Sequence, residues 1–282
     1  MIEHIKNIQN LYGDDVYVQI PNGIFKTLSQ NTRSKNGSAN TKQSSFAYAY
    51  VAIVSLLYKY THFVDIDNST YIQNSDIKEL LGYSRTTKSI DHIIKKGGLL
   101  DNLGLTTTTK DYPVGFEYSS DSINGVAMRT FTTINDIKND DSSYYELIKG
   151  IVKNRNYEIK EPTYFISQDD GNGTLYDYSD THKVSLEEII TFIEDENLDN
   201  IDMYIYFFLK SKCEGYKDNT NSIKLLFIVS QTGMCKFAFY NHLQNLKDKG
   251  YVEVDHKGWT SGSTAKIEAN SYKFNGIVKN LI

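Results

Sequence analysis

Two amide side chains, Asn241 and Gln244, lie three residues apart in a segment whose apolar residues repeat at helical spacing. Phe239, Leu243 and Leu246 would share one face of a helix there, which leaves both amides on the other face. An Asn or Gln amide can make two hydrogen bonds to the adenine edge in the major groove, and an aromatic ring can contact a thymine methyl. The segment therefore predicts readout of base edges, with a preference for A·T pairs. Its outward residues are Phe237, Asn241, Gln244 and Asn245, flanked by Lys236, Tyr240 and Lys247.

Glycines bound this segment on both sides. Gly233 is expected to form the sharp turn between two crossing helices, and Gly250 to end the second helix in a left-handed residue. A strand pair is expected after Gly250, because aromatic and β-branched residues return there. The expected elements are helices over 201–212, 223–232 and 236–249, followed by strands over 251–259 and 264–274.

The spacing of Gly233, Leu243, Leu246 and Gly250 resembles the glycine–leucine–leucine–glycine pattern of winged-helix regulators, over about 198–274. The resemblance implies a recognition helix for the major groove and a β-hairpin wing that touches phosphate or the minor groove. Lys257 and Lys266 would lie at or near that wing. Trp259, the only tryptophan, would touch DNA there or pack beneath the wing.

A second cationic segment follows Gly82. A helix predicted over 84–96 would carry Arg85 near its N-terminal end, where recognition helices usually meet base edges, and would bury Ile90 and Ile94 on its opposite face. A short helix that begins near Asn74 or Ser75 precedes it. We therefore expect a second, less regular winged helix within residues 45–135. In the whole chain, the residues predicted to contact DNA are Arg85, Lys88, Ser89, His92, Lys96, Lys236, Phe237, Tyr240, Asn241, Gln244, Lys257 and Lys266.

The predicted fold class is α+β, mainly helical, with two winged helix-turn-helix domains joined by a helical and hairpin connection. At 282 residues the chain has room for two domains of ordinary size. The helix around 144–152, the hairpin turn at 169–173 and a helix capped by Ser185 and Glu188 would form the connection. The domain prediction is an extended segment and basic arm over 1–44, winged helix 1 over 45–135, the connection over 136–196, and winged helix 2 over 197–282.

Charge is segregated along the chain, although the net charge is only −5. No Asp or Glu occurs from Val16 to Phe63, whereas acidic residues gather between Asp177 and Asp202. The basic arm 26–42 within this stretch would add phosphate contacts. Residues 30–45 predict a polar loop, and the segment before this loop is expected to form a strand pair or extended chain. This asymmetry is typical of a protein with one DNA-facing side.

Other classes of protein lack their signatures here. No GxxxxGK[ST] or GxGxxG loop occurs, and the six histidines show no HExxH or paired spacing, so we expect no enzyme, no cofactor and no metal. The longest apolar run, 46–58, is shorter than the roughly 20 residues of a membrane span and predicts a buried core helix. Two cysteines and no signal peptide favour the cytoplasm.

Tandem winged-helix domains resemble replication initiators of bacterial plasmids and phages, which bind repeated origin sequences. The resemblance implies a sequence-specific protein that binds double-stranded DNA as a monomer or homodimer, together with replication or transcription proteins. A transcriptional regulator of a mobile element is the alternative within this class. A winged-helix protein–protein adaptor is the alternative of another class, and the acidic segment 177–202 suits a protein partner.

Overall fold

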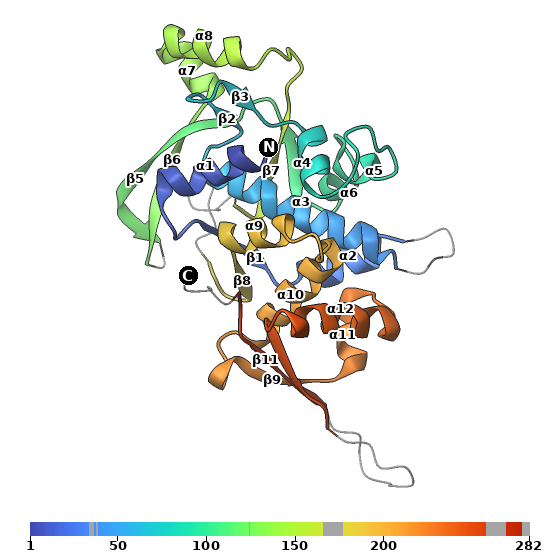
Figure 1. Cartoon of the computed structure of the whole chain (residues 1–282). Helices are drawn as coiled ribbons and strands as arrows, with labels where there is room; N and C mark the ends of the chain where they lie inside the picture. Colours follow the sequence, from blue (N-terminus) through green and yellow to red (C-terminus); the bar gives the residue numbers. More distant parts are fainter. Residues whose placement is uncertain (34–36, 38, 124, 166–176, 258–268, 278–282) are drawn as a thin grey trace, which may run out of the picture. The chain divides into compact units, whose positions relative to one another are not determined.

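The structure is a computed structural model that describes residues 1–33, 37, 39–123, 125–165, 177–257 and 269–277. Over these residues the chain is α+β, with twelve α-helices and small antiparallel sheets, as the sequence predicts at this level (Figure 1). Its contacts divide it into two discontinuous units. Unit 1 comprises 1–20, 49–179 and 183–191, and unit 2 comprises 21–48, 180–182 and 192–282.

Unit 1 is organised around the second half of α3 (Thr41–Lys59), whose residues from Ala49 belong to it. Every residue from Phe46 to Tyr58 is buried, which confirms the predicted core helix. The strands pair as antiparallel ribbons, β2 with β3, β4 with β7, and β5 with β6. The other elements that lie wholly in this unit are α1 (Ile2–Tyr12), β2 (Val64–Asp65), β3 (Thr70–Tyr71), α4 (Asn74–Leu80), α5 (Asp91–Ile94), α6 (Leu99–Asn102), β4 (Thr106–Thr109), β5 (Pro113–Ile123), β6 (Val126–Thr133), α7 (Ile134–Asp140), α8 (Ser142–Ile151) and β7 (Ile159–Pro162).

The predicted helix over 84–96 is wrong. Residues 84–90 form turns, and α5 contains only four residues. The apolar residues that pack, Ile90, Ile93 and Ile94, all fall in the second half of the segment, so nothing anchors a longer helix at its start. Because the segment forms no recognition helix, and β5 and β6 pair only with each other in this part of the chain, the winged helix expected within 45–135 is not formed as predicted.

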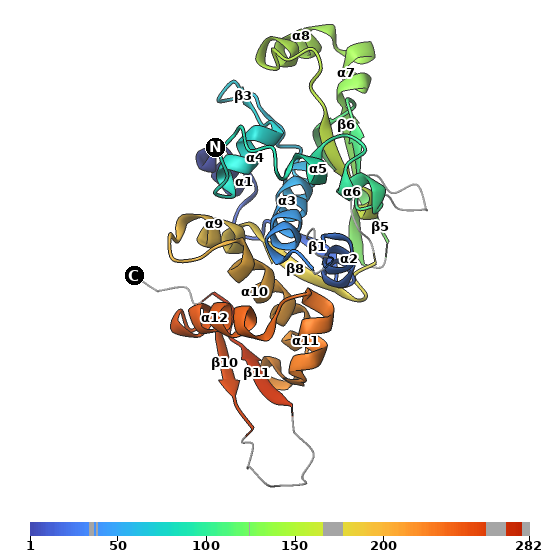
Figure 2. The ribbon, with the colours of Figure 1, turned by 90° about the vertical axis from the view of Figure 1, so that its right-hand side faces the viewer.

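Unit 2 contains three helices and a three-stranded sheet from one continuous part of the chain. In order, these are α10 (Asn200–Cys213), β9 (Thr220–Ile223), α11 (Leu225–Thr232), α12 (Lys236–Asp248), β10 (Val252–Asp255) and β11 (Asn270–Phe274). The strand order is β10-β11-β9, all antiparallel, with Val252 opposite Phe274 and Asn270 opposite Ile223. The helices α10, α11 and α12 and the strands β10 and β11 match the sequence prediction. Strand β9 was not predicted. Figure 2 shows α11 and α12 side by side, with β10 and β11 leading away from them.

An early segment completes unit 2. The segment expected to be extended forms β1 (Tyr17–Pro21) but then α2 (Ile24–Asn31), so the extended prediction is wrong for its second half. The ring of Phe25 on α2 packs against Tyr204 and Phe208 of α10, with ring centroids 5.2 and 5.4 Å apart. The hydroxyl of Tyr204 donates to the carbonyl of Phe25 at 3.0 Å. Burial against α10 therefore determines that α2 is helical.

Among the elements that the structure describes, four begin in one unit and end in the other: β1, α3, β8 (Thr181–Ser185) and α9 (Leu186–Glu194). Strand β8 pairs with β1, and helix α9 follows it. The predicted capping box of α9 is present, since the Ser185 amide donates to Glu188 at 2.9 Å and the Glu188 amide donates to Ser185 Oγ at 3.1 Å. The hairpin turn predicted at 169–173 lies outside the described residues. Within the part of the chain that the structure covers, none of the helices combines the length and apolar character needed to cross a membrane.

Candidate nucleic-acid interface

Helix α12 is attached to unit 2 by the apolar residues that the sequence indicates. Phe239, Leu243 and Leu246 are all at most 2% exposed, and α12 packs against α10 and β10. Its first turn is capped by Cys235, whose Sγ accepts from the Ala238 amide at 3.5 Å. Gly250 follows the helix with φ +74°, the left-handed conformation predicted for it.

Gly233 forms the turn between α11 and α12, where both the backbone conformation and the close packing require a residue without a side chain. Its φ of +70° is in the left-handed region, which side chains disfavour. A Cβ at this position would also lie 2.6 Å from the Cβ of Ala39 and 3.0 Å from that of Ser29. The turn between these helices therefore rests directly on α2 and the segment after it, so the early part of the chain supports the helix pair.

The outward face of α12 is available to a ligand near its N-terminal end. Phe237 is 76% exposed, and Lys236 and Asn241 are exposed as well. The Asn241 amide makes no hydrogen bond to any residue that the structure describes. Gln244 is exposed but held within its own helix, since its Nε2 donates to Asp248 at 2.6 Å and its Oε1 accepts from Lys247 at 3.3 Å. Tyr240, 38% exposed, completes this face.

The inner side of α12 carries a polar clamp that sequence reasoning missed. Asp202 of α10, 1% exposed, accepts from His242 Nδ1 at 2.8 Å and from Asn245 Nδ2 at 3.1 Å. Asn245 thus turns inward, and its predicted outward position is wrong because its amide donates to the buried Asp202, which also accepts from the Asp199 amide at 2.9 Å. Partial burial of the His242 ring opposes protonation, but the hydrogen bond and charge of Asp202 outweigh it and raise the pKa of His242.

The wing is described only at its base. Lys257 follows β10, is exposed and pairs with Asp255 two residues earlier. Lys266 and Trp259 lie outside the described residues. Strand β9 pairs with the edge of β11 that β10 leaves open, and the hydroxyls of Ser222 and Ser271 share a hydrogen bond of 3.0 Å there.

Two acid-free stretches meet in unit 2. Residues 219–247 contain no Asp or Glu, like Val16 to Phe63, and α2 packs against α11. The sequence places these stretches far apart, so only the fold reveals that α2 and α11 are in contact. Acidic residues gather instead at the C-terminal end of α12, where Lys249 pairs with Asp195 and His242 lies beside Asp202 and Asp199. The exposed cations on the acid-free elements of this unit are Lys26, Arg33, Lys42, Lys224 and Lys236.

The residues in the first half of the chain that were predicted to contact DNA lie in turns and a short helix of unit 1. Arg85 is drawn back onto α4, where its guanidinium pairs with Asp76 and Glu79. Lys96 pairs with Glu158 at 3.0 Å. Lys88, Ser89 and His92 are exposed. The cationic stripe predicted along one helix therefore does not form, because its first members precede α5 and its arginine is neutralised.

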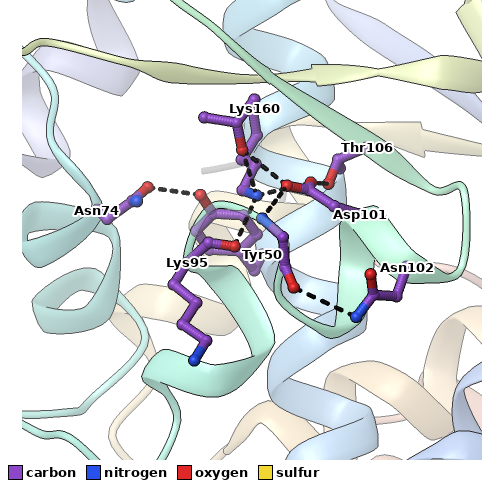
Figure 3. Close-up of polar contacts among 9 residues, drawn as sticks. Tyr50, Asn74, Lys95, Asp101, Asn102, Thr106 and Lys160 are labelled. Carbon is purple, nitrogen blue, oxygen red and sulfur yellow. Dashed lines mark hydrogen bonds and ion pairs between the residues drawn. The ribbon is translucent and has the colours of Figure 1, made fainter.

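A buried ion pair holds the segment after α5 in unit 1 (Figure 3). The Lys160 ammonium, 2% exposed, donates to Asp101 Oδ1 at 2.6 Å, Thr108 Oγ1 at 2.7 Å and the Lys95 carbonyl at 3.1 Å. Asp101 also accepts from the Gly97 amide and the Thr106 hydroxyl. All three ammonium protons have acceptors within the fold, so this pair has a structural role.

Among the residues that the structure describes, two groups of side chains have donor atoms close enough to hold a metal ion. In unit 1 these are His4, His62 and Asp65, and in unit 2 they are Asp199, Asp202 and His242. The Nε2–H of His4 donates to the carbonyl of His62 at 2.9 Å, and the Nε2–H of His62 donates to the carbonyl of His4 at 3.0 Å. Burial, and secondarily the neighbouring His4, lowers the pKa of His62 to about 4. These bonds account for the pair as a neutral tie between α1 and the end of α3.

Comparison of the chain with protein-family models, with curated proteins and with solved structures gives no match.

Proposed function

We propose that unit 2 is a winged helix-turn-helix domain that binds double-stranded DNA, with α12 as its recognition helix. The element order α10, β9, α11, α12, β10, β11 supports the proposal, because two successive helices joined by a glycine turn are followed by a strand pair, and β9 joins that pair in one sheet. The observation that carries the proposal is the exposed face of α12, attached by three buried apolar residues and free of acidic side chains up to Asp248.

The chemistry of this face suits base readout. A helix of 13 residues is about 20 Å long, and its width fits the major groove of about 12 Å. Asn241 offers a free amide for an adenine edge, and Phe237 offers an apolar contact for thymine methyls. Gln244 can exchange its exposed bonds within α12 for a base contact, because surface hydrogen bonds contribute little net stability.

Phosphate contacts would come from the cations around this face. Lys224 and Lys236 lie at the beginnings of α11 and α12, where the helix dipoles also attract anions. Lys26 and Lys42 belong to the adjoining early segment. Such contacts supply affinity that depends on salt, whereas the α12 side chains supply sequence choice.

In its cellular role, the chain acts in the cytoplasm as a replication initiator of a plasmid or phage, with regulation of transcription on a mobile element as the alternative. The support is the proposed winged helix of unit 2 alone, since the first-half winged helix of the tandem architecture is not formed as predicted. Binding-site sequencing across the native replicon distinguishes the two roles. Clustered repeats at an origin indicate initiation, and sites over promoters indicate regulation.

The test of DNA readout is the double variant Asn241→Ala, Gln244→Ala. Each lost bidentate contact lowers discrimination by about 1–3 kcal/mol, so the preference for the selected site over random duplex should fall at least tenfold. Binding to random duplex should survive, since phosphate contacts remain. Gel shifts with both duplexes give the ratio, and Asn10→Ala in α1 is the matched control. An unchanged ratio would show that α12 does not read DNA.

A second candidate function, protein docking, is favoured by one observation. Leu226 and Phe227 on α11 are 69% and 43% exposed, close in sequence to the exposed Phe237 of α12. Apolar side chains of this size attract a protein partner when they are contiguous. If Phe237→Ser abolishes a partner complex while the preference for the selected DNA site is kept, the adaptor role replaces DNA readout for this face.

A further inference from the structure

Unit 1 contains a cavity of about 330 Å³ that none of the DNA-binding residues lines. Its walls come from β1, the end of α3 and the β5–β6 hairpin, segments far apart in the sequence. The side chains that matter are Tyr17, Lys59, Tyr60, Tyr118 and Arg129, with Asp15 at the edge. Known small-molecule sites span about 300–1,000 Å³, so this volume suits a ligand at the small end of that range.

Two cations are buried side by side in this cavity. Lys59 is 6% exposed and Arg129 is 5% exposed. The guanidinium of Arg129 donates to the backbone carbonyl of Lys59, which fixes the two residues together. The ammonium of Lys59 makes a single hydrogen bond within the described chain, to the Tyr17 carbonyl at 2.8 Å, so two of its protons remain for a ligand.

The acidic residue at the cavity edge does not neutralise Lys59. Asp15 pairs with Lys183 at 2.7 Å, and no carboxylate within the described ranges lies at ion-pair distance from Lys59. Burial, and next the charge of Arg129, lowers the pKa of Lys59 to about 7. A buried cation is costly unless it is paired, so we infer that the missing partner of Lys59 is an anion from solution.

Aromatic rings form the rest of the cavity. The Lys59 ammonium lies 4.0 Å from the Tyr17 ring centre, and the Arg129 guanidinium lies 5.0 Å from that of Tyr60. Tyr118 differs from the buried rings, because 61% of it is exposed and its hydroxyl accepts from Arg129 at 2.7 Å. Its ring lies 4.9 Å from the Arg129 guanidinium and 5.5 Å from the Phe116 ring, and its exposed remainder is open to a planar group. Its own hydroxyl proton has no acceptor among the residues described.

We propose that this cavity binds a mononucleotide, with the phosphate between Lys59 and Arg129 and the base against the ring of Tyr118. The phosphate would accept from the ammonium of Lys59 and the hydroxyl of Tyr118, and the guanidinium would add charge. Base–aromatic stacking tolerates any base, so recognition is of the nucleotide class and not of one base. The proposal does not depend on α12, since every residue in it belongs to unit 1.

Calorimetric titration of the full chain tests this site with thymidine 5′-monophosphate, thymidine and inorganic phosphate. The monophosphate should bind at least tenfold more tightly than either part. Lys59→Met should weaken binding at least tenfold, Lys59→Arg should restore most of it, and Tyr118→Ala should reduce the monophosphate to the level of inorganic phosphate. Lys96→Met, an exposed lysine elsewhere in unit 1, is the matched control and should bind like the wild type.

Wild-type protein alone gives a second readout that does not depend on variants folding. A bound phosphate favours charged Lys59, so binding at pH 7.5 should take up protons, and affinity should fall between pH 7 and 9. The ligand is already a dianion in this range, since its second pKa is about 6. Absence of monophosphate binding at millimolar concentration, or binding without proton uptake, overturns the site. Equal binding of phosphate and monophosphate overturns the role of Tyr118. Loss of DNA readout in the α12 double variant with nucleotide binding intact separates this inference from the proposed function.

Discussion

Two segments of this chain pass from a short helix through a glycine with positive φ into a cation-bearing stretch, yet only one continues as a long helix. After Gly233 the chain forms α12 with 13 residues, whereas after Gly82 it forms turns and then α5 with four. Apolar anchors begin at the fourth residue of α12, Phe239, and continue to Leu246. After Gly82, the first anchor is Ile90, eight positions on.

Polar side chains add to this difference. Between Gly82 and Ile90 the hydroxyl of Ser84 bonds locally to Thr86, and Lys78 of α4 binds both the Thr87 carbonyl and Asp91. Such bonds stabilise turns in place of a helix. A glycine turn and a cationic stripe are therefore insufficient to specify a recognition helix. Apolar residues must span its whole length.

The largest difference in stability between the two segments is expected at Phe239, which is fully buried. Phe239→Ala should lower the free energy of unfolding by about 3–5 kcal/mol, because it leaves a cavity beneath α12. Thr86→Ala, at an exposed turn position of the first segment, should change it by less than about 0.5 kcal/mol. Urea denaturation followed by circular dichroism measures both. Equal losses would show that residues 84–90 are as well anchored as α12.

The two glycines give the next largest difference. Gly233→Ala combines left-handed strain of about 1–2 kcal/mol with overpacking against Ala39 and Ser29 of about 1–3 kcal/mol. Gly82→Ala carries only the strain, since no atom lies within 4 Å of its Cβ position. Thermal unfolding of both variants should therefore show the larger loss for Gly233. A larger loss of stability for Gly82→Ala would show that the turn after α4 is the more tightly packed of the two.

Histidines of the two regions should titrate in opposite directions. The pKa of His242 is raised, so its clamp to Asp202 stabilises unit 2 fully below about pH 6.5 and is lost as pH rises through the folded pKa. The pKa of His62 is lowered to about 4, so unit 1 is destabilised as pH falls from about 6.5 towards 4. Ring-proton NMR should show His242 titrating above its ordinary value and His62 below it, with the His242 shift abolished in Asp202→Asn. If His242 keeps its ordinary value in the wild type, the clamp is absent in solution.

The smallest expected effect concerns salt. If Lys236 contacts a phosphate, Lys236→Ala should reduce the slope of log affinity against log salt by about 1. Lys88→Ala, in the turn after α4, should leave the slope unchanged if only unit 2 binds DNA. Fluorescence anisotropy at several salt concentrations measures both slopes. An equal change for Lys88 would restore the first segment as part of the interface.

Much of the fold of unit 2 follows from local pattern, because Phe239, Leu243 and Leu246 repeat within one helix and Gly233 ends the helix before it. The missing parts depend on distant partners. Strand β9 is short and polar and exists only because β11 pairs with it, and Asn245 turns inward only because Asp202 lies 43 residues away in the sequence. The same holds for the pairing of Lys59 with Arg129, 70 residues apart. Periodicity carries no information about such pairs.

The contact of Gly233 with Ala39 and Ser29 has a consequence for how the protein is made. Helix α2 leaves the ribosome long before α10 and α11, and at about 5–20 residues per second the roughly 200 intervening residues take about 10–40 seconds. During that time Phe25, which is buried in the folded chain, lacks its α10 partners Tyr204 and Phe208. Unit 2 therefore completes its core only at the end of synthesis, and a fragment that begins at residue 197 lacks the surface on which its helix turn rests.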